Sequence, residues 1–357
     1  MCALSSIAVV RTYPGIAESA TRVEARGPGR VNLIGEHTDY NGGLALPFAI
    51  ARGVTVTAEA VGGDSVAVEA LDLGESDEFA YANPARETGW KAFARGIVAE
   101  LGVTSGARLE IQGDLPHGAG LSSSAALSAA LALALLGLEG RGRDMGGLEL
   151  ARLCARVENE WVGSPTGLLD QLAVLFAREG EALRIDFQTL ELSHVPLDLG
   201  DWTLATLDCG VTHDNATSGY IDRREECERA CELLGIESLR EAVEADVARL
   251  PEPLDRRVRY VLEENARVDT AVAALTRGDL FELGRLLDAS HAGLRDLYEV
   301  STPEVERTVA AMADAGAVGA RIVGGGFGGA VLGLFRPGAR LPEDALVAEP
   351  GPPARLV

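Results

Sequence analysis

The feature that most constrains the fold of this chain is the segment Ala125–Leu138, which consists almost entirely of alanine and leucine. These residues favour a helix, and the serines that precede them can cap its N-terminus. Because such a helix would be apolar nearly all round, it must be buried on every side. It is too short to span a bilayer. We therefore expect a buried helix that ends at about Leu136.

Apolar residues elsewhere recur with the periods of strands and helices. Alternating patterns predict strands over 54–60, 66–70, 108–113, 183–187, 202–208, 320–323 and 330–335. Helical patterns occur over 148–161, from about 170, and over 218–234 and 254–275. The length of 357 residues predicts about two domains, which we place at 1–190 and 191–357. The last roughly 20 residues are rich in proline and alanine, and we expect a loose tail there.

The charge balance excludes several classes of partner. The chain has 32 lysines and arginines against 54 aspartates and glutamates, a formal net charge of −22. Nucleic acids and anionic membranes bind basic surfaces, so we expect neither as a partner. The single lysine, Lys91, follows Trp90 rather than a glycine, which excludes a Walker A loop.

The cysteines and the N-terminal segment indicate where in the cell the protein is expected. The five cysteines show no CxxC or CxxH spacing, so we expect reduced thiols rather than a zinc site. Residues 1–15 lack the basic start and the unbroken apolar run of a secretory signal. We therefore expect a cytoplasmic protein, and we further expect a monomer.

Between the strand at 108–113 and the apolar helix lies the segment GAGLSSS, Gly118–Ser124. Its glycines let the backbone approach a ligand closely, and the helix start offers free N–H groups and the positive end of the helix dipole. Such a loop is suited to the phosphates of a nucleotide, and its hydroxyls can ligate Mg²⁺. A plain capped turn explains the same residues equally well.

The segment GRVNLIGEHTDYNGG, Gly29–Gly43, is very polar for its glycine content. It carries the charged or polar residues Arg30, Glu36, His37 and Asp39. Two carboxylates and an imidazole so close together can hydrogen-bond a polyol or ligate a metal. A solvated loop is the alternative, and the residue types alone leave the choice open.

The same segment closely resembles the signature of the galactokinase family over its whole length. Three further motifs resemble the wider GHMP kinase superfamily, namely the phosphate loop at 120–127, GLLDQ at 167–171 and IVGGGFGG at 322–329. The resemblance covers roughly residues 22–335. It implies an α+β, two-domain GHMP-kinase fold, with mixed sheets packed against helices and the active site in the interdomain cleft.

This resemblance implies ATP-dependent phosphorylation of α-D-galactose at the anomeric hydroxyl, which gives α-D-galactose 1-phosphate. Asp170 matches the catalytic aspartate, which accepts or orients the proton of that hydroxyl. Arg30 matches the arginine beside the transferred phosphoryl group, where a cation offsets charge on the oxygens. Ser124 and Glu158 match the ligands of the implied Mg²⁺, with ATP as co-substrate.

The remaining site residues follow from the same resemblance. The sugar-binding positions are Glu36, His37, Thr38, Asp39, Gly167 and Tyr220. The nucleotide-binding positions are Gly118, Ala119, Gly120, Leu121, Ser122, Ser123, Ser124, Trp90 and Phe93. In this second group the two aromatic residues would flank adenine, and the others would form the phosphate loop.

One departure from the family pattern lies in the segment SGYIDRREEC, 218–227, where Ile221 replaces an asparagine. Because a polar group near the sugar pocket is lost, the second hypothesis is a related kinase whose acceptor is another sugar, such as N-acetylgalactosamine or L-arabinose. A sensor that binds galactose and ATP without catalysis is the third hypothesis. Against the sensor stand the catalytic and metal-binding residues that the sequence keeps, which are Asp170, Arg30, Ser124 and Glu158.

Overall fold

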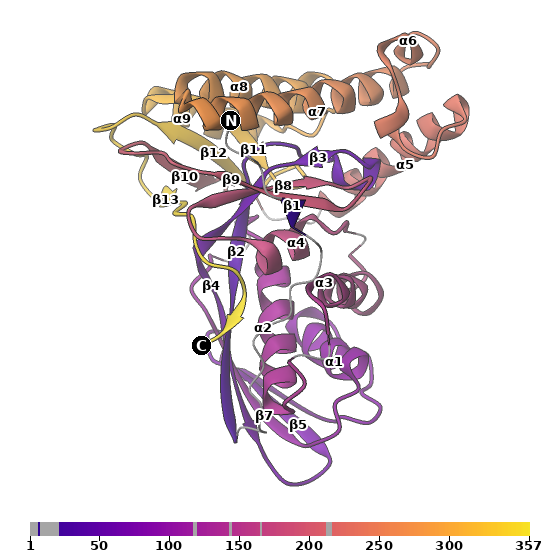
Figure 1. The fold of residues 1–357 in the computed structure, drawn as a ribbon, viewed down its shortest axis with the longest axis vertical. Coiled ribbons are helices and arrows are strands. Elements are labelled where there is room, and N and C mark those ends of the chain that lie inside the picture. The colour runs from indigo at the N-terminus through magenta and orange to yellow at the C-terminus, as the bar shows by residue number, and fades with distance from the viewer. Residues whose placement is uncertain (1–5, 8–20, 117–119, 143–144, 165, 212–215) are drawn as a thin grey trace.

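The computed structural model describes residues 6–7, 21–116, 120–142, 145–164, 166–211 and 216–357. Figure 1 shows an elongated molecule with helices α7 (Leu254–Arg277), α8 (Leu280–Asp296) and α9 (Pro303–Asp314) across one end. A large sheet and helix α2 (Ser123–Leu138) form the opposite end. The fold is therefore the α+β arrangement of mixed sheets packed against helices that the sequence predicts.

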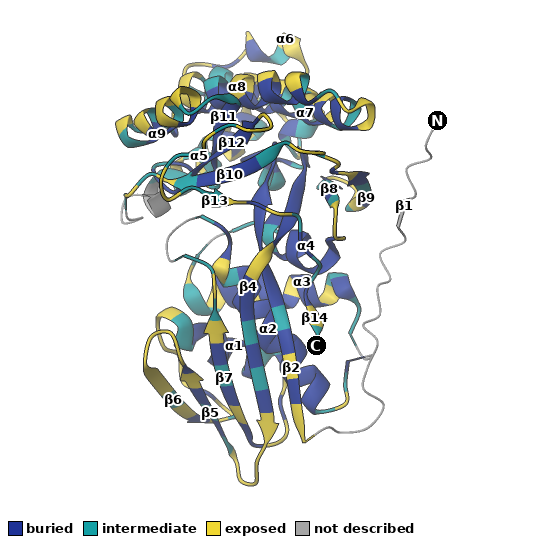
Figure 2. Cartoon of the chain, turned by 90° about the vertical axis from the view of Figure 1, so that its left-hand side faces the viewer, coloured by how far each residue is buried: buried dark blue, intermediate teal, exposed yellow. Residues whose placement is uncertain are grey.

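The N-terminal half is built on a six-stranded sheet. In spatial order its strands are β14 (Arg355–Leu356), β2 (Arg22–Asn32), β4 (Pro47–Ala60), β7 (Ala107–Gly113), β5 (Ser65–Ala70) and β6 (Glu75–Ala80). Neighbouring strands are antiparallel except β5 and β7, which run parallel. Helix α2 packs on one face of this sheet and is itself surrounded by α1 (Gly89–Leu101), α3 (Gly147–Arg156) and α4 (Leu169–Phe176). Figure 2 shows the other face, where buried and exposed residues alternate along the strands.

Helix α2 confirms the predicted buried helix, although it ends at Leu138 rather than at about Leu136. Every residue from Ala125 onward in this helix is buried. Glycine allows the close contact with the sheet, because a Cβ atom on Gly27 of β2 would lie 2.1 Å from the carbonyl oxygen of Ala126. The start of α2 therefore lies directly against β2, the strand that carries Arg30.

Two four-stranded sheets form the rest of the β structure among the described residues, and the second of them combines strands from both halves of the chain. The first contains β11 (Ala317–Val323), β12 (Ala330–Phe335), β10 (Thr203–Asp208) and β13 (Leu346–Val347), in that order. The second contains β1 (Ser6–Ile7), β9 (Glu191–Pro196), β8 (Glu181–Asp186) and β3 (Leu44–Ala45). Helices α8 and α9 pack on the first sheet, and α7 packs against α8, β3 and β9. Helices α5 (Ala216–Leu234) and α6 (Glu244–Val247) contact α7.

The end of the chain differs from the prediction of a loose tail, which is wrong. Strand β13 pairs with β10, and β14 pairs with β2 at the edge of the N-terminal sheet, as the yellow strand in Figure 1 shows. Between them, the amide of Ala354 donates to the carbonyl oxygen of Val174 at 2.9 Å, and Ala354 is buried. Strands of two residues have no readable period, which is why the sequence pattern does not indicate them.

The two halves of the chain are interleaved. The proposed boundary at 190 falls in the turn between β8 and β9, which pair with each other, and the last strand returns to the first sheet. The division into 1–190 and 191–357 therefore remains a proposal. Among the residues that the structure describes, no helix has both the length and the apolar composition needed to cross a membrane.

Candidate active site

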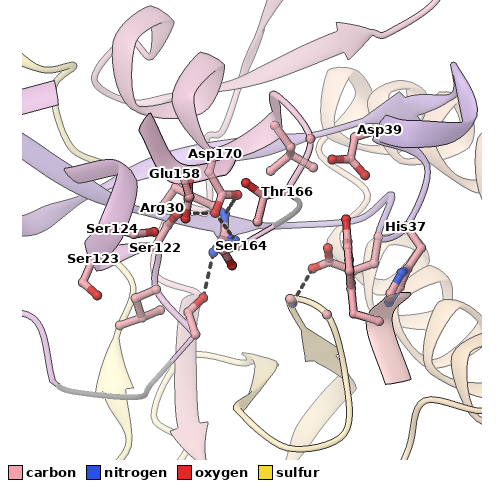
Figure 3. A pocket seen from close by; sticks show the side chains of 18 of the residues that line it. Arg30, His37, Asp39, Ser122, Ser123, Ser124, Glu158, Ser164, Thr166 and Asp170 are labelled. Carbon is pink, nitrogen blue, oxygen red and sulfur yellow. Dashed lines mark hydrogen bonds and ion pairs between the residues drawn. The ribbon is translucent and has the colours of Figure 1, made fainter. Parts of the chain in front are cut away.

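A cavity of about 410 Å³ lies where segments from both halves of the chain meet. It is lined by residues of the polar segment at 29–43, of residues 120–124, which we call the serine loop, and of the segments before and within α4. Residues of the start of α5 and of the glycine motif at 322–329 complete the lining. Figure 3 shows Ser122, Ser123, Ser124 and Glu158 to one side of Arg30 and Asp170, with His37 and Asp39 to the other. The sequence-predicted residues that line it are Arg30, Glu36, His37, Asp39, Gly120, Leu121, Ser122, Ser123, Ser124, Glu158, Gly167, Asp170 and Tyr220.

Arg30 and Asp170 form a two-pronged ion pair in this cavity. Arg30 lies near the end of β2 and Asp170 lies in the first turn of α4. Nε donates to Oδ1 at 2.7 Å and Nη2 donates to Oδ2 at 2.9 Å, while Nη1 donates to the carbonyl oxygen of Gly120 at 2.7 Å. Burial works to lower the pKa of Arg30, but the charges of Asp170, Glu36 and Glu158 and the hydrogen bonds to Asp170 together outweigh it and raise the pKa. A permanent guanidinium charge therefore lies between the carboxylate and the serine loop.

The serine loop is joined to both partners of this ion pair. The amide of Arg30 donates to the carbonyl oxygen of Leu121 at 3.0 Å, and the hydroxyl of Ser122 donates to Oδ2 of Asp170. Ser122 has a φ of 60°, in the left-handed region, and helix α2 begins at the next residue. The first amides of α2 therefore lie beside the cavity with the positive end of the helix dipole. The predicted loop residues Gly118 and Ala119 lie outside the described residues.

Glu158 and Ser124 form a second polar group in the cavity. The sequence predicts a helix over 148–161, and the structure instead ends α3 at Arg156 and continues as a π-helical turn, Val157–Val162, that carries Glu158. Gln171 donates to Oε2 of Glu158 at 2.6 Å, and the hydroxyl of Ser124 lies close enough to the same carboxyl group to favour its charged form. Burial and then the nearby charge of Asp170 raise the pKa of Glu158 to about 7.

The side-chain oxygen atoms of Ser124 and Glu158 are ligands of the kind that Mg²⁺ prefers. A carboxylate and a hydroxyl are hard oxygen ligands, and Mg²⁺ commonly takes its other ligands from water and phosphate. Among the described residues, no group of three or more His, Cys, Asp and Glu side chains could hold a metal ion. The pair Ser124 and Glu158 therefore fits an ion shared with a phosphate ligand rather than one enclosed by the protein.

Glu36 is fixed from the C-terminal half of the chain. The amide of Gly324, which has a φ of 87°, donates to Oε1 of Glu36 at 2.8 Å. The guanidinium of Arg321 lies 3.4 Å from the same oxygen and donates through Nη1 to the carbonyl oxygens of Asn32 and Leu33. Arg321 is fully buried, and the sequence analysis did not single it out. An arginine within an otherwise apolar predicted strand was the signal that could have identified it.

Asp39 lies next to Gly167 in the wall of the cavity. A Cβ atom on Gly167 would lie 2.0 Å from Oδ2 of Asp39, so any larger residue at this position would displace the carboxylate. Burial, with the charges of Asp170 and Glu36, raises the pKa of Asp39 to about 7. Gly167, which has no side chain, therefore leaves the room that the carboxylate of Asp39 occupies.

His37 forms the far wall of the cavity and is buried. Its φ of 58° lies in the left-handed region, which turns the backbone sharply between Glu36 and Thr38. Burial lowers the pKa of His37 to about 3, so its ring is neutral near pH 7. The ring of Tyr220, from α5, lies 5.4 Å from the ring of His37 between centroids.

Three of the predicted site residues that the structure describes do not line this cavity. The hydroxyl of Thr38 is buried within 2.9 Å of the carbonyl oxygen of Gly35 and 2.7 Å of that of Leu44, so it closes the loop rather than facing a ligand. Trp90 donates to Glu75 at the surface and Phe93 packs in the N-terminal core. The contact of these two rings with adenine stays a prediction. Lining residues that the sequence did not assign to the site are Pro116, Ser164, Thr166, Leu169, Gly324 and Gly325, of which the last three lie in the motifs at 167–171 and 322–329.

Comparisons with family models cover most of the chain. The model for the GHMP kinases N terminal domain matches residues 89–178, and the model for the GHMP kinases C terminal matches residues 271–346. The galactokinase galactose-binding signature matches residues 16–60, which include Arg30, Glu36, His37 and Asp39.

Individual proteins agree with these models. The chain is 40% identical over 322 residues to a galactokinase of Thermotoga neapolitana, covering 89% of this chain and 90% of that protein. It is 42% identical over 319 residues to a galactokinase of Mycobacterium bovis, covering 86% and 87%. The solved structure of Lactococcus lactis galactokinase complexed with galactose superposes with a TM-score of 0.86 at 30% identity, covering 94% and 95%. Methanococcus jannaschii mevalonate kinase, with a TM-score of 0.64 at 19% identity over 90% and 92%, shares the fold.

Proposed function

This chain belongs to the galactokinase family of the GHMP kinases, and from that premise we propose how its cavity performs the reaction. The protein is a sugar kinase that transfers the γ-phosphoryl group of ATP to the anomeric hydroxyl of α-D-galactose. The observation that carries the proposed mechanism is the ion pair between Arg30 and Asp170, which lies between the serine loop and the acidic cluster of Glu36 and Asp39.

The serine loop is the proposed binding site for the phosphates of ATP. The first amides of α2 and the hydroxyls of Ser123 and Ser124 can donate to phosphate oxygens, and the helix dipole favours an anion there. The net charge of −22 does not oppose this contact, because carboxylates beyond a Debye length of about 8 Å are screened at physiological salt.

The acidic cluster is the proposed binding site for the sugar. Glu36 and Asp39 can each accept hydrogen bonds from sugar hydroxyls, and Tyr220 can donate to a sugar oxygen, while His37 lines the same cavity. A sugar with one hydroxyl inverted would leave a buried acceptor without its donor, which costs affinity. Fixed carboxylates therefore provide the selectivity for galactose.

Asp170 is the proposed acceptor of the proton from the anomeric hydroxyl. As the O–H bond breaks, the sugar oxygen forms a bond to the γ-phosphorus, and the bond from that phosphorus to the oxygen of ADP breaks. Arg30 stabilises negative charge on the phosphoryl oxygens and keeps the carboxylate of Asp170 in one orientation. The hydroxyl of Ser122 supports the same orientation.

Mg²⁺ is the proposed cofactor, and Ser124 and Glu158 are the residues that would hold it. When bound, the ion neutralises charge on the phosphate oxygens. The hydrogen bond from Gln171 keeps the carboxyl group of Glu158 turned toward Ser124. We also propose a monomeric, cytoplasmic protein without nucleic-acid or membrane partners.

The direct test of the proposed function is ADP release with a panel of sugars. The purified protein, with ATP and Mg²⁺, is expected to release ADP with galactose at a kcat/KM well above that for N-acetylgalactosamine, L-arabinose or glucose. Ile221 is half-buried near the start of α5, so the relative kcat/KM values show whether this substitution relaxes the selectivity. Tight binding of galactose without ADP release would support a sensor and reject the kinase.

Galactose binding is expected to strengthen as the pH rises through 7. Because the pKa of Asp39 is raised to about 7 by burial, its carboxyl group is largely protonated below that pH and offers one acceptor fewer to the sugar. From pH 6 to pH 8 the ionised fraction rises from about a tenth to about nine tenths, so the association constant should rise by up to about tenfold. Calorimetric titration with galactose, without nucleotide, measures this change.

Two variants separate Asp39 from the other carboxyl group that titrates near pH 7. Asp39→Asn should weaken binding and abolish the pH dependence. Glu158→Gln should retain the dependence, because burial also raises the pKa of Glu158 to about 7 but its carboxyl faces the serine loop. A galactose affinity that is constant from pH 6 to pH 8 in the unmodified protein contradicts the role of Asp39.

A further inference from the structure

Helix α7 presents three buried polar side chains to the segment that carries the acidic cluster of Glu36 and Asp39. These side chains belong to Tyr260, Glu264 and Asn265. A buried polar group costs free energy unless it is hydrogen-bonded, so its partners show what it holds in place. Each of the three hydrogen-bonds to a backbone group of residues 35–44, which we call the sugar loop. The sugar loop is therefore attached to a helix from the other half of the chain.

Two of these side chains hold the dipeptide of Gly35 and Glu36 at both of its ends. The amide of Gly35 donates to Oε1 of Glu264 at 2.9 Å, and the hydroxyl of Tyr260 donates to the carbonyl oxygen of Glu36 at 3.0 Å. Positions 260 and 264 are one helical turn apart and so share a face of α7. One turn further on, Cγ2 of Val268 would lie 3.0 Å from a Cβ atom on Gly35, so the backbone lies directly against the helix. We call the two hydrogen bonds the α7 clamp.

The far end of the sugar loop is attached to the same helix. Oδ1 of Asn265 accepts from the amide of Leu44 at 2.8 Å. A Cβ atom on Gly43 would lie 2.6 Å from the same oxygen, so only glycine allows this close approach. The hydroxyl of Thr38 closes the loop internally, because it lies within hydrogen-bond distance of carbonyl oxygens at both ends. The loop is therefore a closed unit that is fixed to α7 at its two ends.

The carboxylate of Glu264 is itself rigidly held. Nε of Arg267 donates to its Oε2 at 2.7 Å, and the hydroxyl of Ser290 on α8 donates to its Oε1 at 2.7 Å. Helices α7 and α8 pack side by side, as Figure 1 shows. A fully buried carboxylate with a cation and two further donors has its charge and its lone pairs satisfied. Glu264 therefore offers the amide of Gly35 an acceptor in a fixed position.

The backbone on either side of Glu36 needs this support. Gly35 has a φ of 97° and His37 a φ of 58°, both in the left-handed region. His37 has a side chain, and a residue other than glycine persists in this region only where its surroundings hold it there. If a hydrogen bond of the α7 clamp is lost, this backbone can relax and the carboxylate of Glu36 can shift.

The clamp acts on one side of the substrate cavity. The carboxylate of Glu36 lines the cavity, where the amide of Gly324 donates to its Oε1 at 2.8 Å. By contrast, Arg30 and Asp170 hydrogen-bond to each other and to the serine loop. A change in the α7 clamp therefore affects the sugar side of the cavity and leaves the groups assigned to phosphoryl transfer in place.

We infer that Tyr260 and Glu264 are positioning residues that hold the carboxylate of Glu36 where it accepts from one hydroxyl of galactose. This inference rests on the proposed function. A hydrogen bond weakens as its length and angle depart from the favoured range, so a carboxylate that is free to shift binds that hydroxyl less well. Helix α7 thus sets the affinity for the sugar through the backbone of the sugar loop.

Tyr260→Phe tests the inference with the smallest change. It keeps the ring, which packs 4.4 Å from the ring of Tyr298 between centroids, and removes only the hydroxyl. KM for galactose is expected to rise by about three- to tenfold, the loss of one net hydrogen bond, with kcat and KM for ATP within about twofold of the unmodified protein. Glu264→Asp is the second variant, because it keeps the charge beside Arg267 and withdraws the acceptor from the amide of Gly35, and it should have the same effect.

A panel of monodeoxygalactoses that keep the anomeric hydroxyl separates positioning from a general structural defect. Because the α7 clamp acts through the carboxylate of Glu36, one deoxy sugar lacks the hydroxyl that this carboxylate binds. For that sugar Tyr260→Phe should lower kcat/KM by less than about twofold, and for the others by the full three- to tenfold. Thr308→Val is the matched control, since it removes a buried hydroxyl that donates to a backbone carbonyl within α9, and kcat/KM should remain normal.

Three results would overturn the inference. They are a KM for galactose within twofold of normal in both variants, an equal loss for every deoxy sugar, and a fall in kcat with KM unchanged. Calorimetric titration of the unmodified protein with galactose makes the proposed function separately testable. If that protein does not bind galactose, the proposed function fails and the inference fails with it, whereas normal binding that neither variant weakens rejects the inference alone.

Discussion

Asp170→Asn is expected to lower kcat by about 10²- to 10⁴-fold, the range that a general base contributes, while galactose still binds. The asparagine has nearly the same shape, and its carbonyl oxygen can still accept a hydrogen bond from Arg30, but its amide cannot take the proton of the anomeric hydroxyl. Steady-state kinetics gives kcat, and calorimetric titration gives the galactose affinity of the same preparation.

Ser122→Ala is the matched control for this change. It removes a different hydrogen bond to the same carboxylate and leaves the base in place, so it should lower kcat far less than Asp170→Asn. Thermal unfolding of both variants separates loss of function from loss of folding. A near-normal kcat in folded Asp170→Asn contradicts the assigned proton transfer.

Arg30→Ala is expected to lower kcat by about 10²- to 10³-fold and to change KM for galactose much less. The guanidinium stabilises the negative charge that develops on the phosphoryl oxygens. This stabilisation matters more in the transition state than in the complex with the sugar. Arg30→Lys should recover part of the loss, because it keeps a positive charge but not the two parallel hydrogen bonds to Asp170.

Arg26→Ala provides the control for removal of an arginine from the same strand. Arg26 is partly exposed on β2 and pairs with Asp114 at 3.1 Å, outside the cavity, so kcat should remain close to normal. If Arg30→Ala raises KM for galactose strongly and leaves kcat intact, Arg30 is a sugar-binding residue and the proposed mechanism is wrong.

Much of the fold could be predicted because its strongest signals are local. The apolar segment Ala125–Leu138 requires a buried helix, whatever the rest of the chain does, and the structure contains it. Residue types alone left the segment Gly29–Gly43 undecided between a ligand site and a solvated loop. The resemblance to a family, and not composition or period, indicated the cluster of Arg30, Asp170 and Glu158 around one cavity.

What the sequence did not indicate depends on contacts over long distances along the chain. Arg321 reaches Glu36 from a strand near the other end of the sequence, and no local pattern describes that approach. Thr38 lies between two cavity-lining residues, but its hydroxyl turns to the backbone carbonyl oxygens of Gly35 and Leu44. The short strand β14 pairs with the edge strand β2 from the other end of the chain, a contact that a sequence pattern cannot reveal.

The anomeric hydroxyl of galactose is proposed to lie between Asp170 and the serine loop. The position of the phosphate on the product tests this placement most directly. Phosphorus-31 NMR of the reaction with galactose, ATP and Mg²⁺ should show one sugar phosphate, coupled to the anomeric proton, that accumulates in step with ADP. A phosphate on any other carbon, or ADP formed without a sugar phosphate, would contradict the assignment of Asp170 and Arg30 to transfer at the anomeric oxygen.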